Sequence, residues 1–198
     1  MTATSLALKI ILIAISYVMG SIPFGVWISQ SMFGIDPRHA GSGNMGATNV
    51  LRVAGKKAAL LTLVGDILKG IFPVLLARFF GVEQQTILFI GFFAILGHLF
   101  PIFLRFKGGK GVAVSLGVFL GIAPMIALVA SMIWLGGVKM GKYSSVGALA
   151  AFGALPFIAF FLKPEPEFVL FCFLLSVLVC FRHKDNIFRL IQGEEKSS

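Results

Sequence analysis

Long apolar runs alternate with short polar connections along the whole chain. The runs cover residues 5–32, 56–80, 86–104, 112–138, 145–162 and 168–182. Most of them reach the ~20 residues that a helix needs to cross the hydrocarbon core of a bilayer. The pattern therefore predicts an all-α, polytopic integral membrane protein in which residues 1–198 form a single membrane domain.

Composition supports this class of protein. Hydrophobic residues make up 58% of the chain and charged residues only 13%, which lies outside the range of ordinary water-soluble domains. The first run has Lys9 near its start, but residues 17–25 (YVMGSIPFG) offer no A-x-A cleavage site. We expect this run to be a permanent membrane helix rather than a cleaved signal peptide.

The basic residues are concentrated in four of the connections. Seventeen Lys and Arg against eight Asp and Glu give a formal charge of +9. Thirteen of the seventeen are Arg38, Arg52, Lys56 and Lys57; Arg105, Lys107 and Lys110; Lys139 and Lys142; and Arg182, Lys184, Arg189 and Lys196. Because an excess of Lys and Arg marks cytoplasmic loops, we expect these connections in the cytoplasm and residues 81–85 and 163–167 outside.

The apolar run 112–138 has basic residues at both ends, so both ends are expected on the same side of the membrane. Residues 120–124 (LGIAP) supply a break at which the chain can turn back. Each half then has only ~11–15 residues, which predicts short or re-entrant helices shielded by neighbours. The result is seven transmembrane helices with a short or re-entrant fourth and fifth, the N-terminus outside and the C-terminus cytoplasmic. The alternative is one ordinary span, with Lys139 and Lys142 outside.

The first glycine segment, residues 41–52 (GSGNMGATNVLR), has the composition of an anion-binding cradle. Its glycines allow positive φ and a close approach of the backbone to a ligand. Hydroxyl and amide side chains add donors, and Arg52 offers a planar fork that suits phosphate. The candidate phosphate-binding residues are Ser42, Asn44, Gly46, Thr48, Asn49 and Arg52.

The second glycine segment, residues 106–111 (FKGGKG), precedes an apolar helix whose N–H groups and dipole favour an anion. A Walker loop is excluded, because its spacing is absent and no strand precedes the segment. For both segments the alternative is a plain turn whose basic residues contact anionic lipid head groups. The candidate phosphate-binding residues here are Lys107, Gly108, Gly109, Lys110 and Gly111.

Two further polar clusters are expected on the cytoplasmic side. Ser144 and Ser145 stand at the start of an apolar run, where they serve as helix N-caps or take part in catalysis. His183 and Asn186 are three residues apart and share a helical face, which is either solvated surface or part of a catalytic site. We expect the four basic connections to meet in one pocket.

Charged and titratable residues also occur inside the apolar runs, where charge is costly. Asp66 and Lys69 are three residues apart, and we expect a buried pair or a tether for a cytoplasmic loop rather than direct chemistry. The sequence assigns no role to His39 or His98.

Several kinds of chemistry are absent from the sequence. The eight acidic residues form no D-x-x-D cluster for divalent cations, and no G-x-S-x-G nucleophile motif occurs. Cys172 and Cys180 lie in an apolar run at a spacing that matches no usual metal site, so they are expected to be core residues. We therefore expect a phosphate site without a metal, a cofactor or a nucleophilic side chain, and no nucleic acid partner.

Three ordered motifs, SGNMGATNVLR, KGGKGVAV, and SSVGAL with RHKDNIFRLIQGEE, resemble the bacterial acyl-phosphate:glycerol-3-phosphate acyltransferases of the PlsY type. The resemblance covers essentially the whole chain. It implies a multi-pass enzyme of the bacterial cytoplasmic (inner) membrane with a cytoplasm-facing active site. It also implies transfer of a fatty acyl group from acyl phosphate to the 1-hydroxyl of glycerol 3-phosphate, giving lysophosphatidate and phosphate for phospholipid biosynthesis. Acyl-CoA and acyl-carrier protein are not the donors.

The resemblance also implies roles for individual residues. The first motif contributes Ser42, Asn44, Thr48 and Arg52, the second places its glycines and Lys110 on phosphate, and the third supplies Ser144 or Ser145 with His183 and Asn186. Either His183 is the general base, oriented by Asn186, or the donor's own phosphate accepts the proton. The acyl tail would lie among membrane lipids and helices.

Two other classes of protein remain open from the residues alone. One is a membrane transporter or channel for a phosphorylated organic anion, although no inverted repeat or charged row through several spans is present. The other is an adaptor whose basic loops hold anionic lipids.

Overall fold

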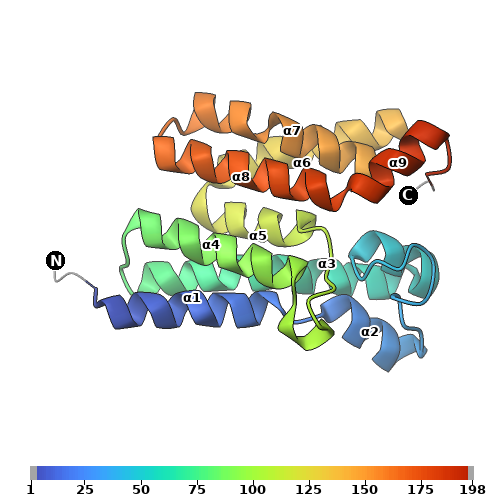
Figure 1. Cartoon of the computed structure of the whole chain (residues 1–198), viewed down its shortest axis with the longest axis horizontal. Coiled ribbons are helices and arrows are strands. Elements are labelled where there is room, and N and C mark those ends of the chain that lie inside the picture. The colour runs from blue at the N-terminus through green and yellow to red at the C-terminus, as the bar shows by residue number, and fades with distance from the viewer. Residues whose placement is uncertain (1–3, 196–198) are drawn as a thin grey trace. The chain divides into compact units, whose positions relative to one another are not determined.

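The computed structural model describes residues 4–195, and over that range it is built from helices without strands (Figure 1). The all-α prediction is confirmed. The helices are α1 (Leu6–Gly20), α2 (Phe24–Phe33), α3 (Ala47–Phe79), α4 (Gln84–Leu99), the short 3-10 helix η1 (Ile102–Leu104), α5 (Val112–Ile122), α6 (Pro124–Gly141), α7 (Ser144–Leu162), α8 (Pro166–Arg182) and α9 (Lys184–Gln192).

The chain forms two compact units, Met1–Ile122 (unit 1) and Ala123–Ser198 (unit 2). In unit 1 the long helix α3 packs against α1, α2, α4 and α5. In unit 2, α7 packs against α6 and α8, and α9 follows α8. Each unit carries part of the residues that the sequence singled out.

Helices α3 and α5 approach each other so closely that only glycine fits between them. A Cβ on Gly117 of α5 would lie 2.0 Å from the carbonyl oxygen of Ile67, and one on Gly70 of α3 would lie 2.2 Å from that of Val114. Small residues at membrane helix contacts permit this close packing. The contact fixes α5, and therefore the second glycine segment that precedes it, against α3.

Five helical stretches of the described chain are long and apolar enough to cross a membrane, and a sixth is reached if α8 and α9, bent by 55°, count as one span. The five are Leu6–Phe33, Ala47–Phe79, Gln84–Leu104, Pro124–Gly141 and Ser144–Leu162. Several membrane helices are thus confirmed. The count of seven and the orientation in the membrane stay predictions.

The predicted break in the apolar run 112–138 is confirmed. Helix α5 ends at Ile122 and α6 begins at Pro124, which occupies the first helical turn, where its missing N–H has no helical partner to lose. Only the first half is short, however: α5 has 11 residues and α6 has 18. The predicted length of ~11–15 residues is therefore wrong for α6, because the helix continues beyond the apolar run to Gly141.

The first apolar run is also interrupted, which the sequence pattern did not predict. Helix α1 ends at Gly20 and α2 starts at Phe24, directly after Pro23. Proline cannot donate a backbone hydrogen bond and disfavours a helical conformation of the residue before it. The run therefore folds as two helices.

Asp66 and Lys69 form the expected buried pair on α3. Asp66 Oδ1 lies 2.8 Å from Lys69 Nζ, and the two side chains are 4% and 1% exposed. Lys69 Nζ also donates a hydrogen bond of 2.8 Å to the carbonyl oxygen of Ile22. The pair thus holds the middle of α3 to the connection between α1 and α2.

We predict that Asp66→Leu alone lowers the free energy of unfolding by about 3–5 kcal/mol, because it leaves the buried Lys69 ammonium without a counter-charge. The double variant Asp66→Leu, Lys69→Met should recover much of this loss, since both charges are then removed. Unfolding of the purified variants in detergent, followed by tryptophan fluorescence, measures both. Equal destabilisation of the single and double variants would contradict the pair's role.

Candidate functional site

The first glycine segment is half turn and half helix. Residues 41–46 form the turn, and α3 begins at Ala47 with Gly46 as its N-cap. Asn44 Oδ1 accepts a hydrogen bond of 2.8 Å from the Gly46 N–H, which orders the turn before the helix. Thr48 and Arg52 consequently project from the first two turns of α3, where the helix dipole favours an anion.

Asn49 organises this turn from the inside. Its Nδ2 donates to the carbonyl oxygens of Pro37 (2.9 Å), Ala40 (3.0 Å) and Asn44 (2.8 Å), and its Oδ1 accepts from the Ser42 N–H at 2.8 Å. The residue is only 2% exposed. Because its amide is engaged by the surrounding backbone, we assign Asn49 a positioning role in place of the direct phosphate contact predicted from the sequence.

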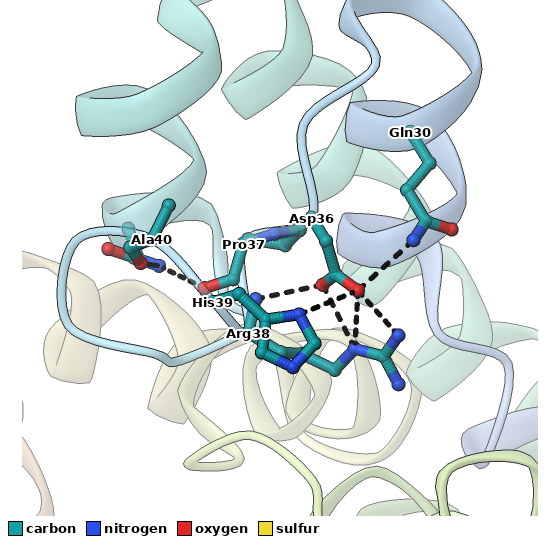
Figure 2. Close-up of polar contacts among 7 residues, drawn as sticks. Gln30, Asp36, Pro37, Arg38, His39 and Ala40 are labelled. Carbon is teal, nitrogen blue, oxygen red and sulfur yellow. Dashed lines mark hydrogen bonds and ion pairs between the residues drawn. The ribbon is translucent and has the colours of Figure 1, made fainter.

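A carboxylate anchors the start of the same turn. Asp36 accepts hydrogen bonds from the Arg38 backbone N–H (2.9 Å) and guanidinium (2.5 Å) and from Gln30 Nε2 of α2 (3.1 Å), and His39 Nδ1 lies 3.4 Å away (Figure 2). The side-chain hydrogen bond from Arg38 is the largest influence on Asp36 and lowers its pKa to about 2. The Arg38 guanidinium is therefore paired with Asp36 in the segment that precedes the turn.

The second glycine segment folds back on the end of α4. The Gly109 N–H donates to the carbonyl oxygen of His98 at 3.1 Å, and the Phe106 N–H donates to that of Pro101 at 2.9 Å. Gly111 has a φ of 89°, and α5 begins at the next residue. The prediction that these glycines lie at the start of a helix is confirmed, but the expectation that the Gly109 N–H is presented to an anion is wrong, because that N–H donates to His98. Lys107 is exposed and Lys110 is half-buried.

Both glycine segments belong to unit 1 and lie at the same end of it, the end toward which α1 runs (Figure 1). Each leads directly into a helix, α3 in one case and α5 in the other. Unit 1 therefore presents two helix N-termini with basic side chains at one end.

In unit 2, Ser144 and Ser145 are the first two residues of α7, and Tyr143 occupies the N-cap position without a side-chain hydrogen bond. The predicted N-cap role of the two serines is therefore wrong, because the helix starts one residue earlier than that role requires. Ser145 is 5% exposed, and its Oγ donates a 2.9 Å hydrogen bond to Glu195 Oε1.

His183 sits at the bend between α8 and α9 and not within one continuous helix. It is 2% exposed and Asn186 is 5% exposed, so the alternative of a solvated surface is wrong. His183 Nδ1 lies 2.8 Å from the carbonyl oxygen of Val179. Since a carbonyl only accepts, Nδ1 carries the hydrogen and the neutral imidazole keeps its lone pair on Nε2.

Glu195 contacts both Ser145 and Asn186, although it was not singled out from the sequence. Its Oε1 accepts from Ser145 Oγ and, at 2.6 Å, from Asn186 Nδ2, while its Oε2 accepts from Arg189 Nε at 2.8 Å. Gly193, with a φ of 73°, ends α9 and turns the chain back, which brings the carboxylate to Asn186. The sequence feature that could have identified Glu195 is its position two residues after Gly193, the glycine that follows the amphipathic helix α9.

The ionisation of Glu195 follows from the same contacts. Burial would raise its pKa, but hydrogen bonds from Arg189, Asn186 and Ser145 outweigh burial and lower the pKa below the usual value for a glutamate. Glu195 is thus a carboxylate at neutral pH and holds Ser145 and Asn186 as an acceptor.

Between residues 4 and 195, no group of three or more His, Cys, Asp or Glu side chains is placed to hold a metal ion. Cys172 is buried in α8, as expected for a core residue, and Cys180 is partly buried. The metal-free character of the site stays a prediction.

Comparison with known proteins agrees with the motifs. A family model described as glycerol-3-phosphate acyltransferase matches residues 10–193. The chain is 45% identical over 185 residues to a curated glycerol-3-phosphate acyltransferase of Methylococcus capsulatus, covering 93% of each chain. It is 46% identical over 187 residues to one of Neisseria meningitidis serogroup C, covering 92% of this chain and 94% of the relative.

Two solved structures match the whole fold. The crystal structure of PlsY, an integral membrane glycerol 3-phosphate acyltransferase, in its glycerol 3-phosphate form has a TM-score of 0.90 and 37% identity, covering 96% of this chain and 95% of that one. The lysophosphatidic acid form of PlsY has a TM-score of 0.87 and 36% identity. The chain therefore belongs to the glycerol-3-phosphate acyltransferase family.

Proposed function

We propose that this protein transfers a fatty acyl group from acyl phosphate to the 1-hydroxyl of glycerol 3-phosphate, giving lysophosphatidate and inorganic phosphate at the cytoplasmic face of the bacterial inner membrane. One observation carries the proposal: unit 1 presents two helix N-termini, each preceded by a glycine segment and accompanied by a basic side chain. Two phosphate-binding elements suit a reaction in which donor and acceptor both carry phosphate.

The two elements divide the phosphate binding between them. At the start of α3, the side chains of Ser42, Asn44 and Thr48 supply donors and Arg52 supplies a bidentate fork, while the Gly46 N–H is donated to Asn44. At the start of α5, the N–H groups of the helix N-terminus act with the charges of Lys107 and Lys110, while the Gly109 and Lys107 N–H groups are donated to the carbonyl oxygens of His98 and Leu104. The glycerol 3-phosphate and lysophosphatidic acid forms of PlsY support glycerol 3-phosphate as acceptor and lysophosphatidate as product.

Unit 2 supplies the groups proposed to act on the reacting atoms. His183 Nε2 keeps its lone pair and is suited to accept a hydrogen bond from the glycerol hydroxyl. Asn186 and Ser144 or Ser145 would orient the acyl phosphate, with Asn186 and Ser145 held by Glu195.

The reaction forms an ester bond between the 1-hydroxyl oxygen and the acyl carbonyl carbon and breaks the bond between that carbon and the phosphate oxygen. Phosphate leaves with the electron pair, so Lys110 and the N–H groups of α5 act by stabilising charge that grows in the transition state. We propose that the leaving phosphate accepts the hydroxyl proton and that His183 positions the hydroxyl. Binding both substrates in line supplies much of the rate acceleration.

The reaction is tested with purified protein, acyl phosphate and labelled glycerol 3-phosphate, with acyl-CoA as a comparison donor. We expect labelled lysophosphatidate and phosphate in equal amounts, and no product from acyl-CoA.

Lys110→Ala and Arg52→Ala should each lower the rate about 10²-fold or more, because each removes a positive charge from a phosphate. Lys57→Ala, an exposed basic residue further along α3, is the matched control and should leave the rate unchanged. Flux of glycerol 3-phosphate across sealed vesicles without covalent product would instead indicate a transporter.

The proton acceptor is tested through the pH dependence of His183→Ala. If the donor phosphate accepts the proton, the variant is slower but still loses activity at low pH, because the phosphate protonates there. If His183 is the base, substitution removes that acidic limb and added imidazole restores activity. The measurement is kcat/KM between about pH 5 and 9, and loss of the limb with imidazole rescue would overturn our assignment.

The role of Glu195 is tested with Glu195→Ala and the neighbouring, exposed Glu194→Ala as control. Removing the Glu195 carboxylate takes away the acceptor that Ser145, Asn186 and Arg189 share, which should cost about 1–3 kcal/mol of stability and lower activity. Because folding lowers the Glu195 pKa, its stabilisation is present above about pH 4.5, the ordinary value for glutamate, and is lost as the pH falls below it. Glu194→Ala should stay within about 0.5 kcal/mol of the parent at every pH. An acid stability profile that is the same in both variants would contradict the assignment.

A further inference from the structure

The imidazole of His98, near the end of α4, lies between the buried acid of α3 and the second glycine segment. His98 Nδ1 is 3.6 Å from Asp66 Oδ1, and the His98 side chain is 3% exposed. On its other side, a Cβ added to Gly109 would lie 2.1 Å from His98 Nε2 and 2.8 Å from Cε1. The ring therefore fills the space directly beneath Gly109.

Gly109 is required for a reason unlike that at its neighbours. Its φ lies outside the left-handed region, so the backbone itself would accept alanine. The three atoms nearest to an added Cβ all belong to the His98 ring. At Gly108, in contrast, an added Cβ would lie 2.1 Å from the carbonyl oxygen of His98, 2.4 Å from Cδ of the Pro101 ring and 2.5 Å from the carbonyl oxygen of Leu99.

His98 holds the same glycine through its backbone as well. The Gly109 N–H donates to the His98 carbonyl oxygen at 3.1 Å, so ring and main chain of one residue contact one glycine. Asp66, in turn, is fixed by the ammonium of Lys69 at 2.8 Å and faces the opposite edge of the ring. A titratable side chain inside an apolar helix usually has such a specific task.

We propose that His98 is a positioning residue for the second glycine segment: Asp66 orients the imidazole, the imidazole supports Gly109, and Lys110 and the N-terminus of α5 are thereby held where phosphate binds. His98 itself does not touch the substrate. The nature of the ligand rests on the proposed function, whereas the contact between His98 and Gly109 does not.

The test adds a methyl group at residue 109 and removes the imidazole ring at residue 98, separately and together. Gly109→Ala forces its methyl group into the imidazole and should lower kcat/KM about 10²-fold, since a displacement of about 1 Å at a phosphate site can cost that much. His98→Ala should raise the KM for the phosphorylated substrates about tenfold with a smaller change in kcat. In the double variant the methyl group enters the space left by the ring, and kcat/KM should rise at least tenfold above that of Gly109→Ala.

Gly108→Ala is the matched control, because its nearest obstacles are the His98 carbonyl oxygen and the Pro101 ring, which removal of the His98 side chain leaves in place. Adding His98→Ala to Gly108→Ala should give no recovery. The proposal is overturned if the double variant with Gly109→Ala is no better than Gly109→Ala alone, or if Gly108→Ala recovers equally. Should His98→Ala fail to fold, His98→Asn replaces it: the shorter amide keeps a polar group beside Asp66 and leaves room for the methyl group.

Hydrogen–deuterium exchange separates this proposal from the proposed function. We expect His98→Ala to speed exchange of the amides of residues 107–111 at least tenfold, without change in α7. If the parent protein makes no lysophosphatidate, the function fails while the exchange result still decides the role of His98. If the parent is active, and exchange at residues 107–111 is unchanged in His98→Ala, the positioning role alone is refuted.

Discussion

Every backbone N–H and C=O inside a bilayer must find a partner within the protein, because the hydrocarbon core supplies none. This constraint makes the described chain helical and leaves irregular backbone and unpaired helix N–H groups only where helices start, stop or bend. The residues proposed to bind substrate occur at these places: the starts of α3, α5 and α7 and the bend between α8 and α9. The helical fold pairs the backbone groups inside the bilayer, and the ends of its helices are the positions at which phosphate is proposed to bind.

The scarce acidic residues act mainly as internal anchors. Asp36 orders the start of the first turn, Asp66 joins α3 to the end of α4, and Glu195 gathers donors from α7 and α9. Asp66 and Glu195 contact buried polar groups, Lys69 in one case and Ser145 and Asn186 in the other, which is how a small number of charges can define a polar site in an apolar protein. These acids are paired with Arg38, Lys69 and Arg189, whereas the proposed function assigns Arg52 and Lys110 to phosphate.

The glycine segments contain two kinds of residue that look alike in the sequence. Arg52 and Lys110 carry the charge suited to phosphate, whereas Asn49 and Gly109 hold the backbone in place. Asn49 does so by hydrogen bonds to the turn around it, and Gly109 by leaving room for an imidazole. Placement of the charged groups therefore depends on residues that need not touch a ligand themselves, as preorganised sites require.

The sequence alone determined the local features. The apolar runs, the break before Pro124, the buried pair of Asp66 and Lys69, and a helix start after the second glycine segment follow from hydrophobic periodicity, proline geometry and the three-residue spacing of a helix face. Only the tertiary structure decided that Glu195 meets Ser145, fifty residues away, and that His98 supports Gly109. The physical reason is the distance along the chain over which each interaction acts. Hydrogen bonds within a helix form between residues that are close in sequence. Contacts between distant segments depend on how the helices pack, which no local pattern encodes.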